Sequence, residues 1–156
     1  MNTIVLHANT NRIYFTCLIN KMKYRVLLDT GSPNTIITLD LAMSLGLPVV
    51  GKKSEIRLMG ATLPVVPVVI PQVTLGSATI SDVRVLAGLN EKSWKDTIIL
   101  GLNVLNYFKY TINRETNPGH ITLELNNRQP PSGDRSKFNY LLGNNGYYIT
   151  NEGGDL

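Results

Sequence analysis

The sequence predicts an all-β domain with a barrel-like arrangement of strands and one or two short helices. Short runs rich in β-branched and aromatic residues recur along the chain, and glycine, proline and asparagine separate them. Only two segments have a helix-like pattern, and both are short. The 156 residues suit one compact domain, and 43% hydrophobic against 17% charged residues is typical of a globular protein.

The first predicted hairpin joins a strand over residues 13–19 to a strand over residues 23–28 through a tight turn at residues 20–21. A polar loop over residues 29–34 follows, and residues 35–38 are extended again. This order places a polar loop directly after a hydrophobic strand.

A short helix is predicted over residues 40–45, and Gly46 and Pro48 stop it from continuing. Residues 54–63 then alternate between polar and apolar side chains around Gly60. That pattern is typical of a β-hairpin with its turn at the glycine.

The β pattern continues over residues 65–69, 72–75 and 79–86, with a turn at Gly76. Residues 97–100 form a continuous apolar run, which predicts a buried strand ending at Gly101.

Residues 102–108 have helical spacing, with Leu102, Leu105 and Phe108 expected on one face. Residues 109–113 and 121–125 are expected to pair as strands across a turn at residues 117–119.

The chain changes character after residue 125. Residues 126–137 are polar and proline-containing, which predicts a linker or an ordered arm. Residues 139–150 predict one more hairpin around residues 144–146. We therefore expect a domain over residues 1–125 and a C-terminal extension over residues 126–156.

The charge pattern indicates no nucleic-acid partner. The net charge is +4, and the fifteen lysines and arginines are scattered rather than gathered in a stripe. The longest apolar stretch, residues 63–70, is short and interrupted by two prolines, so no membrane span is expected. The N-terminus lacks the pattern of a signal peptide, which favours a cytoplasmic protein.

One cysteine and two separated histidines predict no metal site and no internal disulfide. Cys17 lies in an apolar run and is expected to be a buried structural thiol. No phosphate-binding loop, zinc-protease motif or serine-hydrolase motif occurs in the chain. No cofactor is therefore expected.

The strongest chemical signal is Asp29-Thr30-Gly31-Ser32, which directly follows a hydrophobic strand. An acidic residue in that place lies at the end of a buried element, where it can face a cleft. Gly31 lets the backbone turn tightly, and the hydroxyls of Thr30 and Ser32 can hydrogen-bond the carboxylate or nearby backbone. Asp-Thr-Gly also occurs in ordinary turns, so this segment alone is not decisive.

A second signal, Ile98-Ile99-Leu100-Gly101-Leu102-Asn103-Val104-Leu105, follows about seventy residues downstream. Together, the two segments and the hairpin between them resemble the retropepsin-like family of aspartic peptidases. The resemblance covers residues 13–125. It implies a closed β-barrel or sandwich with a flap hairpin, and a homodimer that hydrolyses polypeptide substrates.

The resemblance also implies a role for each matching position. Asp29 is the catalytic carboxylate, and Thr30, Gly31, Ser32 and Gly101 support the active-site loops. The flap spans residues 57–62 and folds over the substrate. Substrate-binding positions are Leu27, Asn34, Ile36, Leu58, Met59, Gly60, Ala61 and Ile99. For Leu27, Ile36 and Ile99, ordinary core packing is an equally good interpretation.

The presence of one such aspartate predicts a dimer. Aspartic peptidases use two carboxylates that share a proton, because two carboxylates a few ångströms apart do not easily both ionise. None of the other aspartates precedes Thr-Gly or Ser-Gly; they are Asp40, Asp82, Asp96, Asp134 and Asp155. The second carboxylate is therefore expected from a second copy across a two-fold axis.

Several positions depart from the retroviral pattern. Ser32-Pro33-Asn34 replaces the acidic residues that follow Asp-Thr-Gly there, Leu102 replaces an arginine, and the flap has one glycine, Gly60. These departures resemble the cellular or bacterial branches. The extension could enter a dimer-interface sheet, fold over its own subunit or occupy the cleft.

Two other functions remain open. One is a catalytically silent retropepsin fold that binds peptides or acts as a dimeric scaffold. The other is an unrelated β-barrel binding protein in which Asp29-Thr30-Gly31 is only a turn. That interpretation does not explain the second signal around Gly101. The favoured prediction is hydrolysis of peptide bonds next to apolar residues, at acidic to near-neutral pH, by a water activated between two Asp29 side chains.

Overall fold

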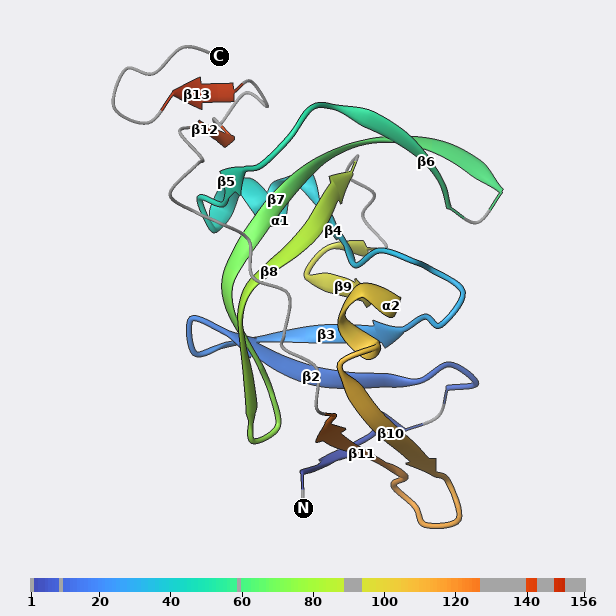
Figure 1. The fold of residues 1–156 in the computed structure, drawn as a ribbon. Helices are drawn as coiled ribbons and strands as arrows, with labels where there is room; N and C mark the ends of the chain where they lie inside the picture. Colours follow the sequence, from blue (N-terminus) through green and yellow to red (C-terminus); the bar gives the residue numbers. More distant parts are fainter. Residues whose placement is uncertain are drawn as a thin grey trace.

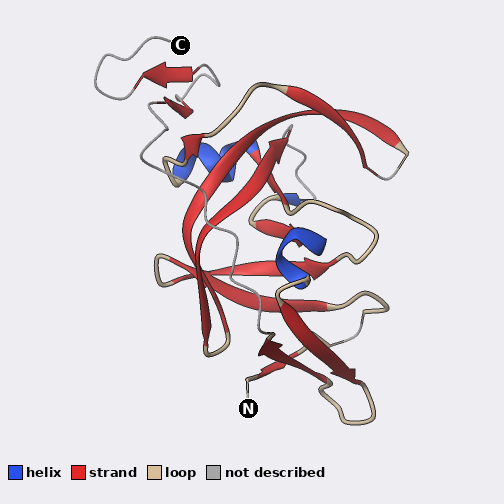
Figure 2. Ribbon diagram, viewed as in Figure 1, coloured by secondary structure: helices blue, strands red, loops and turns tan. Residues whose placement is uncertain are grey.

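The computed structural model describes residues 2–8, 10–58, 60–88 and 94–126, and the backbone alone of residues 140–142 and 148–150. Strands dominate this part of the chain, and its two helices are short, α1 (Leu39–Ser44) and α2 (Leu102–Leu105) (Figures 1 and 2). The predicted all-β fold class is therefore confirmed. The strands are β1 (Thr3–Val5), β2 (Tyr14–Ile19), β3 (Met22–Leu28), β4 (Ile36–Thr38), β5 (Pro48–Val49), β6 (Ser54–Leu58), β7 (Ala61–Leu75), β8 (Ala78–Gly88), β9 (Thr97–Leu100), β10 (Phe108–Asn113), β11 (His120–Leu125), β12 (Tyr140–Leu142) and β13 (Tyr148–Thr150).

Six strands close into a barrel. The pairing runs from β2 through β3, β9, β4, β8 and β7, and β7 pairs with β2 again. Each strand of the ring thus has a partner on both sides, which removes free sheet edges. The interior is filled by fully buried aliphatic and aromatic side chains; they include Phe15, Ile19, Val26, Val68, Ile70 and Ile80.

One parallel pairing brings the two signals found in the sequence together. β3 runs parallel to β9, with Leu28 opposite Leu100. Because parallel strands end at the same edge of a sheet, the residues that follow them, Asp29 and Gly101, emerge side by side.

The hairpin of β6 and β7 stands over one end of the barrel (Figure 1). Leu58 pairs with Ala61, so the turn has two residues, and Gly60 has a φ of +81° that favours glycine. The predicted hairpin at residues 54–63 is confirmed. β7 is one continuous strand past Pro71, whereas the sequence suggested two shorter strands there.

A second sheet has the strand order β1-β11-β10 and packs below the barrel (Figure 1). The prediction of a helix as far as Phe108 was wrong, because α2 ends at Leu105 and Phe108 pairs with Leu125 in a strand. Val104 and Leu105 are the buried residues of α2, and Leu102 is half-buried. β1 was not predicted, since three residues are too few for a periodic pattern.

The C-terminal hairpin predicted at residues 139–150 has its two strands paired, with Leu141 opposite Ile149. Its expected turn lies outside the described residues, as does the polar stretch from residue 127. β12 pairs with β5, with Leu141 opposite Pro48, and β5 in turn pairs with β7 of the barrel. No helix in the described segments is long and apolar enough to cross a membrane.

Candidate active site

Asp29 is held at the end of β3 by backbone hydrogen bonds on both sides. Its N–H donates to the carbonyl of Leu100 at 3.0 Å, and its own carbonyl accepts from Ser32 N–H at 3.2 Å. The side-chain Oδ1 accepts from Gly31 N–H at 3.0 Å. The carboxylate is half-buried, so it keeps access to the outside while one of its oxygens is fixed by the loop.

Gly101 is required by close approach, and Gly31 lies tightly against the Asp29 side chain. A Cβ on Gly31 would lie 3.3 Å from Asp29 Oδ1. A Cβ on Gly101 would lie 2.7 Å from the Ser32 carbonyl oxygen and closer still to the backbone of Asn34. No side chain fits in that space, so the two loops touch through their backbones.

The start of α2 completes this contact. Leu102 N–H donates to the carbonyl of Ser32 at 2.8 Å, and Asn103 N–H donates to that of Pro33 at 3.1 Å. Ser32 is buried, and its hydroxyl donates to the carbonyl of Asn34 at 2.7 Å. Ser32 therefore shapes the loop from within.

Thr30 faces the outside of the same loop. It is exposed, and its hydroxyl makes no hydrogen bond within the part of the chain that the structure describes. Asn34 is half-buried, with its carbonyl against Gly101.

Two polar residues of the site were missed in the sequence. Thr35 is 2% exposed, and its Oγ1 accepts from Gly101 N–H at 3.2 Å and donates to Asn103 Oδ1 at 2.7 Å. Asn103 Nδ2 donates to the carbonyl of Arg84 in β8 at 2.8 Å. The available signal was a polar residue inside an otherwise apolar segment at each position.

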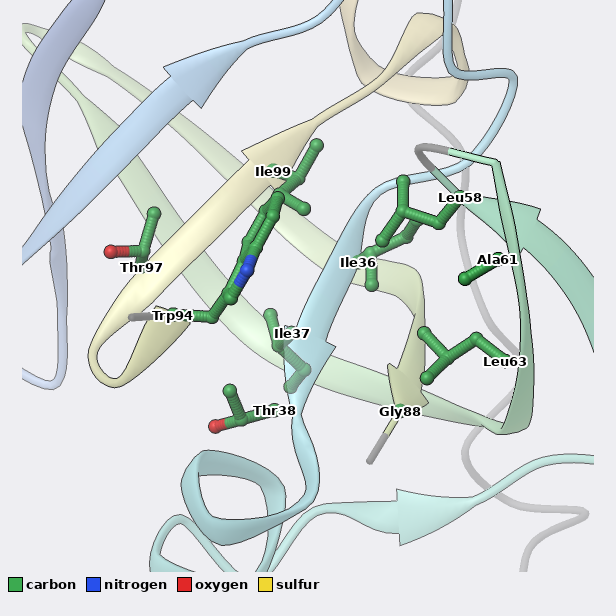
Figure 3. A pocket seen from close by; sticks show the side chains of 10 residues that line it. All are labelled: Ile36, Ile37, Thr38, Leu58, Ala61, Leu63, Gly88, Trp94, Thr97 and Ile99. Carbon is green, nitrogen blue, oxygen red and sulfur yellow. The ribbon is translucent and has the colours of Figure 1, made fainter. Parts of the chain in front are cut away.

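A cavity of about 240 Å³ lies between the flap hairpin and strands β4 and β9 (Figure 3). Four of the predicted substrate-binding residues line it, namely Ile36, Leu58, Ala61 and Ile99. Six further residues complete the lining: Ile37, Thr38, Leu63, Gly88, Trp94 and Thr97.

Other predicted positions lie elsewhere. Leu27 is buried opposite Ile99, but it is not part of the lining. Asn34 and Gly60 are also outside it, and Met59 is not among the described residues.

The walls of the cavity are apolar even where they contain threonine. Thr38 Oγ1 accepts from Leu41 N–H at 3.1 Å, as the cap of α1. Thr97 Oγ1 accepts from the Arg25 guanidinium at 2.9 and 3.0 Å. In Figure 3 both oxygens point away from the indole of Trp94. With these hydroxyls occupied elsewhere, the cavity suits an uncharged, apolar group.

The cavity and the carboxylate adjoin without overlapping. Asp29 is not among the lining residues, but Ile99 precedes Leu100, whose carbonyl accepts the Asp29 N–H. A group in the cavity would thus lie beside the carboxylate rather than on it. This arrangement suits a molecule that extends past Asp29 and places one side group under the flap.

Cys17 takes no part in this site. It is buried, and burial raises the pKa of its thiol to about 12. Across the described segments, no three histidine, cysteine, aspartate or glutamate residues gather as metal ligands would.

Comparisons with known proteins relate the chain to a family and to solved structures of similar fold. A family model described as "Aspartyl protease" matches residues 15–104, more than half of the chain. A retropepsin-like aspartic protease from Rickettsia conorii is similar in structure, with a TM-score of 0.54 and 20% identity over 78% of this chain and 89% of that chain. The retroviral protease-like domain of Ddi1 from Leishmania major has a TM-score of 0.49 and 17% identity over 83% of this chain and 99% of that chain. No curated protein matches the sequence significantly.

Proposed function

Because the chain belongs to the aspartyl protease family, we propose that it is an aspartic endopeptidase with Asp29 as its catalytic carboxylate. The observation that carries this proposal is the fixed position of Asp29. Its Oδ1 accepts from Gly31 N–H, and its backbone N–H donates to Leu100 beside Gly101. A half-buried carboxylate that is preorganised next to an apolar cavity suits the activation of a water molecule.

The reaction requires a second carboxylate, and we assign it to Asp29 of a second copy. One ionised Asp29 removes a proton from water, and its protonated counterpart donates a hydrogen bond to the scissile carbonyl. The water attacks the carbonyl carbon directly, so no covalent intermediate and no cofactor are needed. The exposed Thr30 next to the half-buried Asp29 suits a surface that a partner subunit covers.

The substrate class follows from the cavity under the flap. A polypeptide bound beside Asp29 would direct one side chain into the space between Ile36, Ile99 and Leu58. An apolar side chain would fill it without leaving a buried polar group unpaired, whereas a charged one would lose its hydration with no partner in the walls. We therefore expect cleavage next to apolar residues, and we assign residues 1–125 as the catalytic unit.

The test is digestion of a diverse peptide library by the wild type and by Asp29→Asn, from acidic to neutral pH. The proposal predicts cleavage by the wild type alone, at apolar sites. Asp40→Asn is the matched control, because Asp40 is exposed in the first turn of α1 and should leave cleavage unchanged. Equal cleavage by wild type and Asp29→Asn would reject Asp29 as the catalyst. If the folded wild type binds peptides but cleaves none, the chain is a peptide-binding module instead.

A further inference from the structure

Arg25 is an exposed cation next to the cavity, and its side chain is held in one orientation. Its Nε and Nη2 both donate to Thr97 Oγ1, at 3.0 and 2.9 Å. Its guanidinium carbon lies 4.9 Å from the centre of the Tyr14 ring, which is within the range of a cation–π contact. Because an arginine side chain loses much rotamer freedom when it binds, these two contacts prepare the guanidinium for a ligand.

The Arg25 guanidinium has no acidic partner in the part of the chain that the structure describes. Its two contacts there, Thr97 and Tyr14, carry no negative charge. Asp96 meets Arg25 only through the backbone, where its carbonyl accepts from Arg25 N–H at 3.2 Å. The edge formed by Nη1 and Nη2 is therefore left to pair with a carboxylate from outside, in the two-pronged geometry that favours arginine.

Arg25 projects from the same face of the sheet as the residues of the cavity. Arg25 in β3 lies opposite Thr97 in β9, and Leu27 lies opposite Ile99. Because alternate residues of a strand face the same side, the four side chains form two neighbouring rows on one face. Thr97 and Ile99 both line the cavity (Figure 3). The guanidinium thus lies at the rim of the cavity, in the row of Thr97.

The cation is adjacent to the cavity but outside its apolar walls. In Figure 3 the Thr97 hydroxyl, which accepts from Arg25, points away from the Trp94 indole. The guanidinium therefore lies on the far side of Thr97, where it is exposed to water. One ligand could fill the cavity with an apolar group and place a charged group at the rim, without burying an unpaired charge.

From this arrangement we propose that Arg25 selects substrates with an acidic side chain two positions from the apolar residue in the cavity. Side chains two positions apart in an extended peptide face the same side and are about 6.6 Å apart. An apolar side chain under the flap would thus place the second one at the rim, within reach of the guanidinium. The inference rests on the proposed function, since it assumes that a polypeptide binds beside Asp29.

The expected preference is modest, because the guanidinium is exposed and water competes for it. An exposed ion pair changes an equilibrium constant by up to about fivefold. A peptide with Glu at this position should therefore bind about threefold to fivefold more tightly than the same peptide with Gln, and less so at high salt. Because the pair forms before the reaction and persists through it, the difference should appear in KM rather than in kcat.

Paired peptides test the inference without requiring cleavage. Each peptide carries one Leu and either Glu or Gln two positions before or after it, and anisotropy of a dye on the peptide measures binding to Asp29→Asn. Adding Arg25→Gln should remove the preference for Glu. Arg25→Lys should keep part of it, because lysine retains the charge but not the planar fork. Arg25→Glu should reverse it, so that Lys is preferred to Gln in the peptide.

Lys23→Gln is the matched control. Lys23 is an exposed cation on the same face of β3, but the pairing with β9 begins only at Arg25. The substitution removes the same charge from the chain, so it measures general attraction of an acidic peptide. It should leave the preference for Glu in place. Thermal unfolding of each variant verifies that the fold persists.

The outcomes separate the acidic specificity from the activity. Equal affinity for the Glu and Gln peptides, binding of neither, or an equal loss of preference in Lys23→Gln and Arg25→Gln would overturn the role of Arg25. If the wild type still cleaves and Asp29→Asn does not, the peptidase proposal survives that result. If Glu peptides bind through Arg25 but the wild type cleaves none, the acidic specificity stands and the activity is rejected.

Discussion

Thr35 donates a hydrogen bond to Asn103 Oδ1 at 2.7 Å, across the gap between the Asp29 loop and α2. The same hydroxyl accepts from Gly101 N–H, and the amide of Asn103 reaches the carbonyl of Arg84. One buried hydroxyl thus connects the Asp29 loop, the Gly101 loop and β8. This connection fixes the loop that carries the carboxylate to the barrel behind it.

Thr35→Val should lower the free energy of unfolding by about 1–3 kcal/mol, because Gly101 N–H and Asn103 Oδ1 lose a buried partner while the shape is kept. Chemical denaturation measures the change. Thr79→Val is the control, since Thr79 pairs with Thr74 through exposed hydroxyls and should cost less than about 0.5 kcal/mol. If the two substitutions lower the free energy of unfolding equally, the buried hydrogen bonds of Thr35 stabilise the protein no more than an exposed threonine pair does.

Gly101→Ala should both destabilise the protein and reduce cleavage. The added methyl would enter the space of the Ser32 and Asn34 backbones, so the Asp29 loop would have to move. Overpacking of this kind costs about 1–3 kcal/mol or more. Gly60→Ala is the control, because its added methyl group would meet no atom within 4 Å and would cost only the strain of the positive φ. Both kcat/KM and the melting temperature should therefore fall more in Gly101→Ala than in Gly60→Ala. The reverse order would contradict the proposed loop contact.

Ala61→Leu should shift cleavage toward smaller side chains, because the added atoms project into the cavity that Ala61 lines. One or two methylene groups in an apolar pocket change kcat/KM by about tenfold or more. Peptide profiling measures the shift. Thr62→Leu changes the next residue, which is exposed and outside the lining, and should leave the profile unchanged. If Ala61→Leu leaves the cleavage profile unchanged, the cavity does not bind a substrate side chain.

Cys17 should resist alkylation in the folded protein and react once the protein is unfolded, because burial both shields the thiol and raises its pKa to about 12. The same shift predicts a loss of stability at high pH. Below the ordinary value of 9.0 the thiol is protonated in both states. As the pH rises from there toward 12, only the unfolded state releases the proton, so the free energy of unfolding falls. Cys17→Ala should show a weaker dependence on pH in this range.

Local patterns in the sequence predicted most of the barrel. The alternation around Gly60 gave the flap hairpin, and the apolar run before Gly101 gave β9, because both depend on side-chain periodicity and on glycine. The helix as far as Phe108 was wrong for a tertiary reason. Phe108 is buried through its strand pairing with Leu125, a contact that helical spacing does not reveal.

The candidate site was predictable in part. Asp29 and Gly101 were identified from a motif and its spacing. Thr35 and Asn103 were not, because their hydrogen-bond partners lie sixty-eight and nineteen positions away, and only the folded chain brings them near. Trp94 was not identified either, because it lines the cavity together with Ile36 and Leu58 from distant parts of the chain. Sequence periodicity detects which face a side chain occupies, but it does not detect which distant group the side chain contacts.

Mixing wild type with Asp29→Asn tests most directly whether two copies share one site. Subunits are exchanged at fixed total concentration, and peptide cleavage is measured as the wild-type fraction falls. If each site needs both carboxylates, activity follows the square of that fraction, so an equal mixture retains about one quarter of the wild-type rate. If each chain acts alone, the rate falls in proportion and about one half remains. The account predicts the quadratic curve, and a linear one would contradict it.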